Sequence, residues 1–421
     1  MTNARRPFRA AILLVGVLVS GPVAAQPRWP TTLDEARVEA GREQPASFVA
    51  SEQVRLLGQA LERYRDIEER GGWGKVPTDL AIGPGYSYDC RRIAAVEKRL
   101  VAEGYLHRMS TPPPAPIAAP AQRAQPLRGE PPMGRGGPCP YGPALTEAVR
   151  AFQADRKILG FGQVGKQTMV ALNRPVHEIV KTIARDLERW RRVSLETSGN
   201  YLLVDIPFYE LGVFENDRER MRIQVIVGQP TWQTPQFSDE LEYIILNPDW
   251  GIPDKIAKQE YWPSAHRDRD YLRRQGITAI GGSLRQKPGP RNPLGRIKFV
   301  MPNKDDVYLH DTPEKRAFEA AVGALSHGCI RLSRPMDLAN YLLRDDSQWN
   351  PRALETAIAS GKTMQINLRR RMPVHILYST SRVNEEGRLE LRPDVYAKNR
   401  DAEYEEEQRA PRSDESLQAW P

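Results

Sequence analysis

The sequence predicts an α+β protein whose first half is helical and whose second half is mainly β. In the first half, apolar residues recur every three or four positions, as on a helix with one buried face. From Tyr201 onward, short apolar runs alternate with polar residues and end at turn residues, which is typical of strands. A helical stretch at 252–275 interrupts these strands, so a small insertion over the β half is expected.

Several helices are predicted along the first half, and glycine or proline marks their ends. Three of them are expected at 90–103, 144–155 and 167–172. Pro175 opens a connector helix at 175–195, because proline suits the first turn of a helix. The first helix stops at Gly71-Gly72 and carries one apolar stripe, made of Val54, Leu57, Leu61, Tyr64 and Ile67.

A long insert at 109–143 lies between the helices expected at 90–103 and 144–155. It holds eleven prolines. Proline lacks a backbone N–H and fixes φ, so such a segment cannot pack as regular secondary structure. We expect an extended or mobile loop.

Strands are predicted through the second half at 201–206, 208–214, 222–227, 241–246, 296–301, 307–310, 329–332 and 364–368. The helical stretch is rich in Tyr, Trp and Arg and is expected to form a lid, at about 250–290, over a site built by the strands. Within the lid, 281–290 is interpreted as a flexible hinge or loop. A helix at 335–343 should pack its leucines inward.

The first 25 residues have the features of an export signal. Arg5, Arg6 and Arg9 flank the start of an apolar run at 10–19, and small residues follow at 23–25, where a signal peptidase cleaves. The run is shorter than the ~20 apolar residues that span a bilayer, so no membrane anchor is expected after cleavage. The Arg5-Arg6 pair also hints at the twin-arginine route.

The charge of the chain limits its partners. The formal charge of +8 falls to +5 when the three arginines of the export signal are removed. This modest excess suits an anionic polymer, although a solvated surface of mixed charge explains most of it. Nucleic acid is not an expected partner, because no compact Lys/Arg run alternates with aromatic residues and the chain is exported.

Three cysteines in an exported chain indicate one disulfide and one free thiol. Cys90 and Cys139 are the natural pair and leave Cys329 reduced, while two separate thiols are the alternative. Closing this loop would stabilise the fold by ~4 kcal/mol in the chain-entropy model.

The segment with the most side chains suited to catalysis is Ser326-His327-Gly328-Cys329-Ile330-Arg331. A nucleophilic cysteine needs a base, since the thiolate is the reactive form and a free thiol has a pKa of ~8.5. His310 and His327 are both candidates. On extended strands His327, Cys329 and Arg331 share one face, and Tyr308 shares a face with His310. Gly328 leaves nearby backbone N–H groups open for an oxyanion.

Other interpretations of Cys329 remain open on these residues alone. A free cysteine is often a buried structural residue. His310, His327 and Cys329 could hold a metal, but a fourth ligand is not evident, so neither a metal nor another cofactor is expected. A papain-like protease is disfavoured, because its Cys-Gly-x-Cys-Trp context is absent.

These motifs resemble the signature of the L,D-transpeptidases, the cysteine enzymes that remodel bacterial peptidoglycan. The resemblance rests on a histidine, a gap and Ser-His-Gly-Cys-x-Arg, and it continues through 223–230, 247–253 and 292–299. It runs from about 201 to 397 and is closest to the large periplasmic members, which implies a mainly β catalytic domain with a helical lid. The segments 147–153 and 165–168 resemble a small helical peptidoglycan-binding module.

The resemblance also implies roles for individual residues. Cys329 would be the nucleophile and His310 the proton donor and acceptor, oriented by the backbone carbonyl of Asp311. Gly328 would belong to the oxyanion hole. Substrate binding would fall to Ser326, His327, Arg331 and Tyr308. Among these, His327 and Arg331 would hold a substrate carboxylate.

The implied reaction is acyl transfer between peptidoglycan tetrapeptide stems. A cysteine thioester forms with release of D-Ala, and an amine of a neighbouring stem resolves it into a 3-3 cross-link, a step in building the cell wall and cell shape that carbapenems inhibit. The same site would suit an L,D-carboxypeptidase or a wall-attachment transpeptidase. A non-catalytic wall-binding scaffold is the alternative from another class, and other cell-wall enzymes are candidate partners.

The resulting domain order is an export signal (1–25), a helical scaffold (26–76), a peptidoglycan-binding-like module (77–174) with the insert at 109–143, the connector helix (175–195), the catalytic domain (196–397) and a disordered tail (398–421). The tail is polar and carries an acidic run. With the export signal, this order places the mature protein in the periplasm.

Overall fold

The computed structural model of the protein describes residues 49–77, 81–107 and 138–399. The predicted export signal (1–25), most of the proline-rich insert (109–143) and nearly all of the predicted tail (398–421) lie outside these residues. Within the described part of the chain, no helix has both the length and the apolar character needed to cross a membrane.

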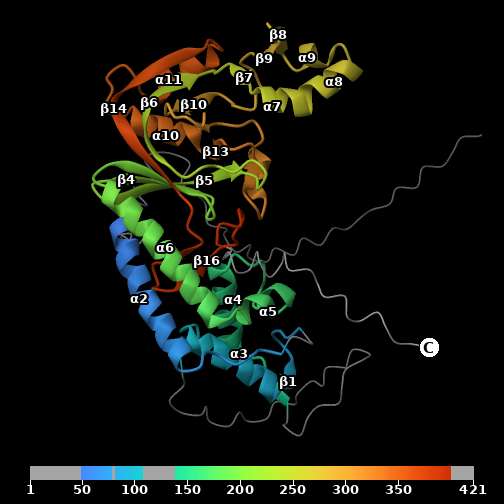
Figure 1. Ribbon diagram of the computed structural model, residues 1–421, viewed down its shortest axis with the longest axis vertical. Helices are drawn as coiled ribbons and strands as arrows, with labels where there is room; N and C mark the ends of the chain where they lie inside the picture. The colour runs from blue at the N-terminus through green and yellow to red at the C-terminus, as the bar shows by residue number, and fades with distance from the viewer. Residues whose placement is uncertain (1–48, 78–80, 108–137, 400–421) are drawn as a thin grey trace, which may run out of the picture.

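Two long helices run along one side of the molecule. α2 (Ala50–Glu69) and α6 (Val176–Glu196) lie side by side (Figure 1). Leu57 and Trp190 are buried between them, so the apolar stripes predicted from the sequence pack on each other. The same cluster includes Tyr201 of the first strand of the β domain, which joins the helix pair to that domain.

A compact helical unit closes around its own apolar core at the lower end of these helices (Figure 1). Cys90 and Cys139, the pair expected from the sequence, are joined by a disulfide in this unit. The unit lies where the peptidoglycan-binding-like module is predicted, and its ligand stays a prediction. Its elements are β1 (Ser87–Asp89), α3 (Cys90–Ala102), β2 (Pro138–Pro140), α4 (Pro143–Asp155) and α5 (Lys166–Leu172).

The second half of the chain forms a nine-stranded sheet in the order β12-β5-β13-β11-β10-β6-β14-β3-β4. β5 also pairs with β4, so the sheet closes on itself. Every strand predicted from the sequence is present, although β14 is longer than expected and β12 was not expected. The strands are β3 (Tyr201–Asp205), β4 (Glu210–Glu215), β5 (Arg218–Gly228), β6 (Ser238–Leu246), β10 (Ile297–Val300), β11 (Leu309–His310), β12 (Ala324–Ser326), β13 (Ile330–Leu332) and β14 (Met364–Leu377).

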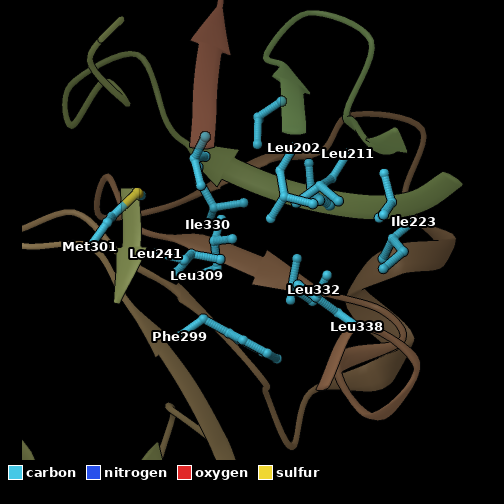
Figure 2. Packing of buried hydrophobic residues seen from close by; sticks show 14 of the residues in the cluster. Leu202, Leu211, Ile223, Leu241, Phe299, Met301, Leu309, Ile330, Leu332 and Leu338 are labelled. Carbon is cyan, nitrogen blue, oxygen red and sulfur yellow. The ribbon is translucent and has the colours of Figure 1, made fainter. Parts of the chain in front are cut away.

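The inside of the closed sheet is the largest apolar core of the described residues. Side chains from different strands, such as Leu202, Ile223 and Leu309, gather there (Figure 2). The helices α10 (Pro335–Leu342) and α11 (Pro351–Ala359) pack on it. Each buried leucine or isoleucine contributes about 1.5–3 kcal/mol, so this core holds even the two- and three-residue strands β11 and β13 in place.

A separate small unit projects from one end of the β domain, at the position of the predicted lid (Figure 1). Its strands form a sheet in the order β7-β9-β8, and it has its own apolar core. The lid is therefore a folded unit that combines short helices with a sheet. Its elements are β7 (Trp250–Ile252), α7 (Asp254–Ile256), the π-helical turn η1 (Ala257–Tyr261), α8 (Trp262–Arg267), α9 (Tyr271–Arg274), β8 (Ile277–Ile280) and β9 (Ser283–Gln286).

The expectation of a flexible loop at 281–290 is wrong in part. Its residues 283–286 form β9, the central strand of the lid sheet. The two buried side chains of β9 are Leu284 and Gln286, and the glutamine donates to the carbonyls of Gln275 and Arg291 at 2.9 and 3.1 Å. An inward-facing glutamine hides the apolar alternation by which a strand is recognised.

A C-terminal hairpin, absent from the sequence prediction, connects the parts of the molecule. It consists of β15 (Ser381–Val383) and β16 (Leu389–Leu391). Gln53 of α2 exchanges two hydrogen bonds with the backbone of β15, at 2.8 and 2.9 Å. Arg388 pairs with Asp155 of α4 at 2.7 Å. The hairpin therefore ties the helical unit and the long helices to the β domain.

The disulfide leads to a labelling prediction. Protein from an oxidising compartment, denatured without reductant, should take up one equivalent of a thiol reagent, because Cys90 and Cys139 are bonded to each other. Peptide mapping should place the label on Cys329. A reduced sample, labelled at all three cysteines, is the control. Three labels without reductant would contradict the bond.

Candidate active site

A cavity of about 1240 Å³ lies between the lid and the β domain. Its lid side is lined by residues of β7, α7 and η1, and its other side by residues of β10, β11 and the loop before β13. Cys329, His310 and Tyr308 all line it, together with His327 and Arg331. The side chains that the sequence picked out for chemistry therefore meet in one cavity.

Cys329 lies in the loop between β12 and β13, directly before Ile330. Ile330 and Leu332 are completely buried in the core, whereas Cys329 and Arg331 are partly exposed. The alternation expected from the sequence thus holds in the structure. The core side chains of β13 determine that the thiol points away from the core and into the cavity.

The loop that carries the thiol is held by its own side chains and by a neighbouring turn. Gly328 has φ +111°, a conformation that L side chains rarely adopt. The Ser326 hydroxyl donates to the Cys329 carbonyl at 2.5 Å and accepts from the Gly328 N–H at 3.2 Å. Thr234 donates to the Gly328 carbonyl at 2.7 Å. Ser326 is buried and acts within the loop, so its binding of substrate stays a prediction.

His310 is the buried histidine of the site. The contact between its Nδ1 and the backbone carbonyl of Asp311 is 2.5 Å, which assigns the ring proton to Nδ1 and leaves Nε2 as an acceptor. Asp311 is itself held, because its carboxylate accepts from the Arg296 N–H at 2.9 Å and from Lys315 at 2.6 Å. Gly295 makes this arrangement possible, since a Cβ there would lie 2.4 Å from the Asp311 carboxylate.

Burial sets the protonation states of both reactive groups. Desolvation, aided by the positive charge of Arg331, lowers the pKa of His310 to about 3. Desolvation also raises the pKa of the Cys329 thiol above its usual value, against the opposing effects of Tyr308 and Lys298. At neutral pH the resting site therefore holds a neutral thiol and a neutral imidazole that can accept a proton.

The thiol and the imidazole are not hydrogen-bonded to each other within the described residues. The Cys329 thiol instead donates to the backbone carbonyl of Asp306 at 3.8 Å. Tyr308 lies beside the thiol, and its ring centroid is 5.6 Å from that of His310. In an enzyme without bound substrate, the hydrogen bond between a nucleophile and its base is often long. The observation that relates Cys329 to His310 is therefore that both side chains line the same cavity.

His327 and Arg331 are already paired with acids. His327 Nε2 lies 2.7 Å from Glu260 of the lid, and Arg331 lies 2.9 Å from Glu314. The His327 ring also meets Trp232 edge-on, with centroids 5.0 Å apart. Of the two histidines, His310 is the one with a buried ring and an anchored Nδ1, and this geometry favours it as the base.

Sequence reasoning missed four residues of the cavity. Glu260 and Trp232 contact His327, as above. Asp306, with φ +51°, presents its carbonyl to the thiol. Lys298 stands on β10 opposite His310 of β11. Only Lys298 had a usable signal: its neighbours Ile297 and Phe299 are core residues, so alternation places Lys298 on the other face.

The described residues contain no group of three or more His, Cys, Asp and Glu side chains placed to hold a metal ion. The alternative set of His310, His327 and Cys329 is accordingly not gathered as a metal site. The lining of the cavity includes a thiol, an imidazole and hydrogen-bond donors.

The β domain matches a known family over most of its length. Residues 199–376 match the model of the L,D-transpeptidase catalytic domain. The β domain belongs to this L,D-transpeptidase family. A Haemophilus influenzae protein provisionally named an L,D-transpeptidase is 28% identical over 243 residues, which are 53% of this chain and 49% of that protein. The match thus covers about half the length of this relative.

Solved L,D-transpeptidases are also similar to part of the chain. The Mycobacterium smegmatis enzyme is 13% identical over 42% of this chain and 58% of its own, with a TM-score of 0.25. The Xylanimonas cellulosilytica enzyme is 17% identical over 71% of this chain and 98% of its own, with a TM-score of 0.22. TM-scores of this size do not by themselves establish a shared fold.

The charge state of His310 can be observed directly. Its lowered pKa, about 3, predicts that the ring stays neutral, with the proton on Nδ1, as pH falls from 8 to 5. Heteronuclear NMR of the ring nitrogens would follow this, with His310→Gln to assign the signal. A titration near the ordinary histidine pKa of ~6.5 would contradict the buried geometry.

Proposed function

We propose that this protein is an L,D-transpeptidase that forms 3-3 cross-links in peptidoglycan through a thioester on Cys329, with release of D-Ala. The observation that carries the proposal is the single cavity, under a lid, that joins a cysteine thiol to a buried, neutral and anchored imidazole. A wall-binding scaffold needs neither group.

The first half-reaction forms the acyl-enzyme. His310 Nε2 takes the thiol proton as Cys329 sulfur attacks the carbonyl between the third stem residue, a diamino acid, and D-Ala. The carbonyl oxygen becomes an oxyanion. The C–N bond then breaks, and the imidazolium returns its proton to the nitrogen of the leaving D-Ala. A base of low pKa is a strong acid once protonated, which suits this second transfer.

Two groups are suited to stabilise the oxyanion. The Cys329 N–H forms no hydrogen bond within the described residues, so it is open to a ligand. The Tyr308 hydroxyl lies beside the thiol, and burial, with the nearby thiol, raises its pKa well above the usual value, so it remains a donor. The sequence also led us to expect a contribution from the Gly328 N–H. This group already donates to the Ser326 hydroxyl, so that hydrogen bond would first have to break.

The second half-reaction resolves the thioester. The side-chain amine of a neighbouring stem attacks the thioester carbonyl, His310 takes a proton from that nitrogen, and the thiolate leaves and recovers a proton from His310. Water competes with the amine, and the lid supplies apolar surface from Trp250, Ile252 and Tyr261 against it. Hydrolysis or attachment of another molecule to the wall at the same site is the nearest alternative.

The remaining parts of the proposal concern location and partners. The helical unit would hold peptidoglycan near the cavity, and other cell-wall enzymes would act beside it. An exported protein of modest positive charge suits the periplasm and its anionic polymer. These assignments rest on the resemblance of the unit and on the signal-like first 25 residues.

Acylation by a carbapenem tests the proposed nucleophile. The wild-type protein should gain one drug mass, located on Cys329 by peptide mapping, because the thiol forms the acyl-enzyme. Cys329→Ala should gain none and release no D-Ala from a tetrapeptide stem, while retaining binding to insoluble peptidoglycan. A drug mass on Cys329→Ala, or D-Ala release by it, would refute the role of the thiol.

The identity of the base is tested by the pH dependence of the same acylation. His310→Gln should react at least 100-fold more slowly at pH 7, since general-base catalysis is worth about 10²–10⁴-fold, and should recover partly as pH rises and the thiol ionises unaided. His327→Gln is the matched variant and should lack this recovery. A pH-rescued defect in His327→Gln alone would show that His327, and not His310, is the base.

A further inference from the structure

Lys298 is a cation in the cavity that the reaction, as described so far, does not use. Among the described residues its ammonium forms no ion pair, whereas Arg331 pairs with Glu314 and His327 lies against Glu260. A charge that is partly removed from water and has no direct ion-pair partner is costly, and an anionic ligand would offset this cost. Desolvation lowers the pKa of Lys298, and Cys329 and Asp306 oppose this effect at longer range.

The position of Lys298 is built by the strand that carries it. Ile297 and Phe299 are buried in the core, so Lys298 projects from the opposite face of β10 into the cavity. Its Nζ lies 3.7 Å from the ring centroid of Tyr308, within the range of a cation–π contact. Tyr308 in turn lies beside the Cys329 thiol, which places the ammonium at one side of the nucleophile.

We propose that Lys298 binds the terminal carboxylate of the donor stem and thereby selects donors that end one residue beyond the bond that Cys329 attacks. This inference rests on the proposed function and names the feature of the substrate that the site recognises. The terminal carboxylate belongs to the residue that leaves, which directly follows the residue whose carbonyl is attacked. The Cα atoms of two consecutive residues are about 3.8 Å apart. A cation for it must therefore lie close to the sulfur.

The family resemblance implied that His327 and Arg331 hold a substrate carboxylate, and their pairing with acids argues for a different cation. Arg331 and His327 would each have to leave an acid 2.9 or 2.7 Å away, whereas Lys298 has no acid within ion-pair distance among the described residues and interacts with Asp306 only at longer range. A longer stem has an amide at this point in place of a carboxylate. It would present no charge to the ammonium and would be a poorer donor.

Stabilisation of the Cys329 thiolate is the competing role for Lys298, since the two groups interact electrostatically. The two roles differ in what they predict. A carboxylate-binding lysine discriminates between donors that differ only at the terminus. A thiolate-stabilising lysine changes the reactivity of the thiol with every reagent, including neutral ones.

The experiment compares two donors on the full-length protein: a tetrapeptide stem with a free terminal carboxylate and the same stem ending in a carboxamide. The readout is kcat/KM for release of the terminal residue. Wild-type enzyme should prefer the acid by about 10- to 100-fold, the range of a charge-assisted hydrogen bond. Lys298→Gln should bring the ratio of acid to amide close to one, and Lys298→Arg should keep a preference for the acid.

Lys255→Gln is the matched control. Lys255 is a lid lysine whose ammonium lies 3.8 Å from the ring centroid of Trp232, so it makes the same kind of contact on the other side of the cavity. This variant should retain the ratio of the wild type. Thermal unfolding of each variant checks that the fold is intact, and the rate of Cys329 alkylation by neutral iodoacetamide reports on the thiol itself.

Two results would overturn the inference while leaving the proposed function intact. One is a wild-type enzyme that releases the terminal residue from both donors at equal rates. The other is a Lys298→Gln variant that slows both donors and iodoacetamide alike while keeping the wild-type ratio, which assigns Lys298 to the thiolate. A folded wild-type enzyme that releases nothing from either donor refutes the proposed function, and the inference falls with it.

Discussion

The parallel pairing of β11 with β13 is the contact on which the site depends. Its register sets Leu309 beside Ile330 and His310 beside Arg331. Leu309 and Ile330 are fully buried, so the alternate residues of both strands face the cavity. Neither strand is long enough to be stable alone, and the apolar core beneath them, with β5 and β10 on either side, fixes the distance between His310 and Cys329.

Two folded units, the β domain and the lid, contribute different groups to the cavity. The β domain supplies the thiol, the imidazole and the ammonium from strands or from a loop tied by Ser326 and Thr234, and rigid elements suit groups that must hold a reactive geometry. The lid supplies apolar cover and Glu260, which reaches His327 across the cavity. This contact joins the lid to the loop that carries Cys329.

Much of the site could be predicted from the sequence, because its signals are local. Cys329 and His310 lie in short motifs, and the alternation of buried and exposed residues around them follows from strand periodicity. The disulfide followed from the count of cysteines in a chain that is predicted to be exported. What escaped prediction depends on residues distant in sequence: Glu260 meets His327, and Gln53 binds β15 more than three hundred residues away. β9 escaped because one of its inward residues is a glutamine with two backbone partners.

The most direct test of the account is a mass-spectrometric profile of the products formed from purified tetrapeptide muropeptides. The account predicts dimers joined by a 3-3 link, with one D-Ala released for each link, and an acyl-enzyme intermediate on Cys329 whose mass corresponds to the donor without its terminal residue. Tripeptide products without dimers would assign the site to hydrolysis. Unchanged muropeptides with an intact, reactive Cys329 would contradict the central claim that the thiol and His310 carry out acyl transfer.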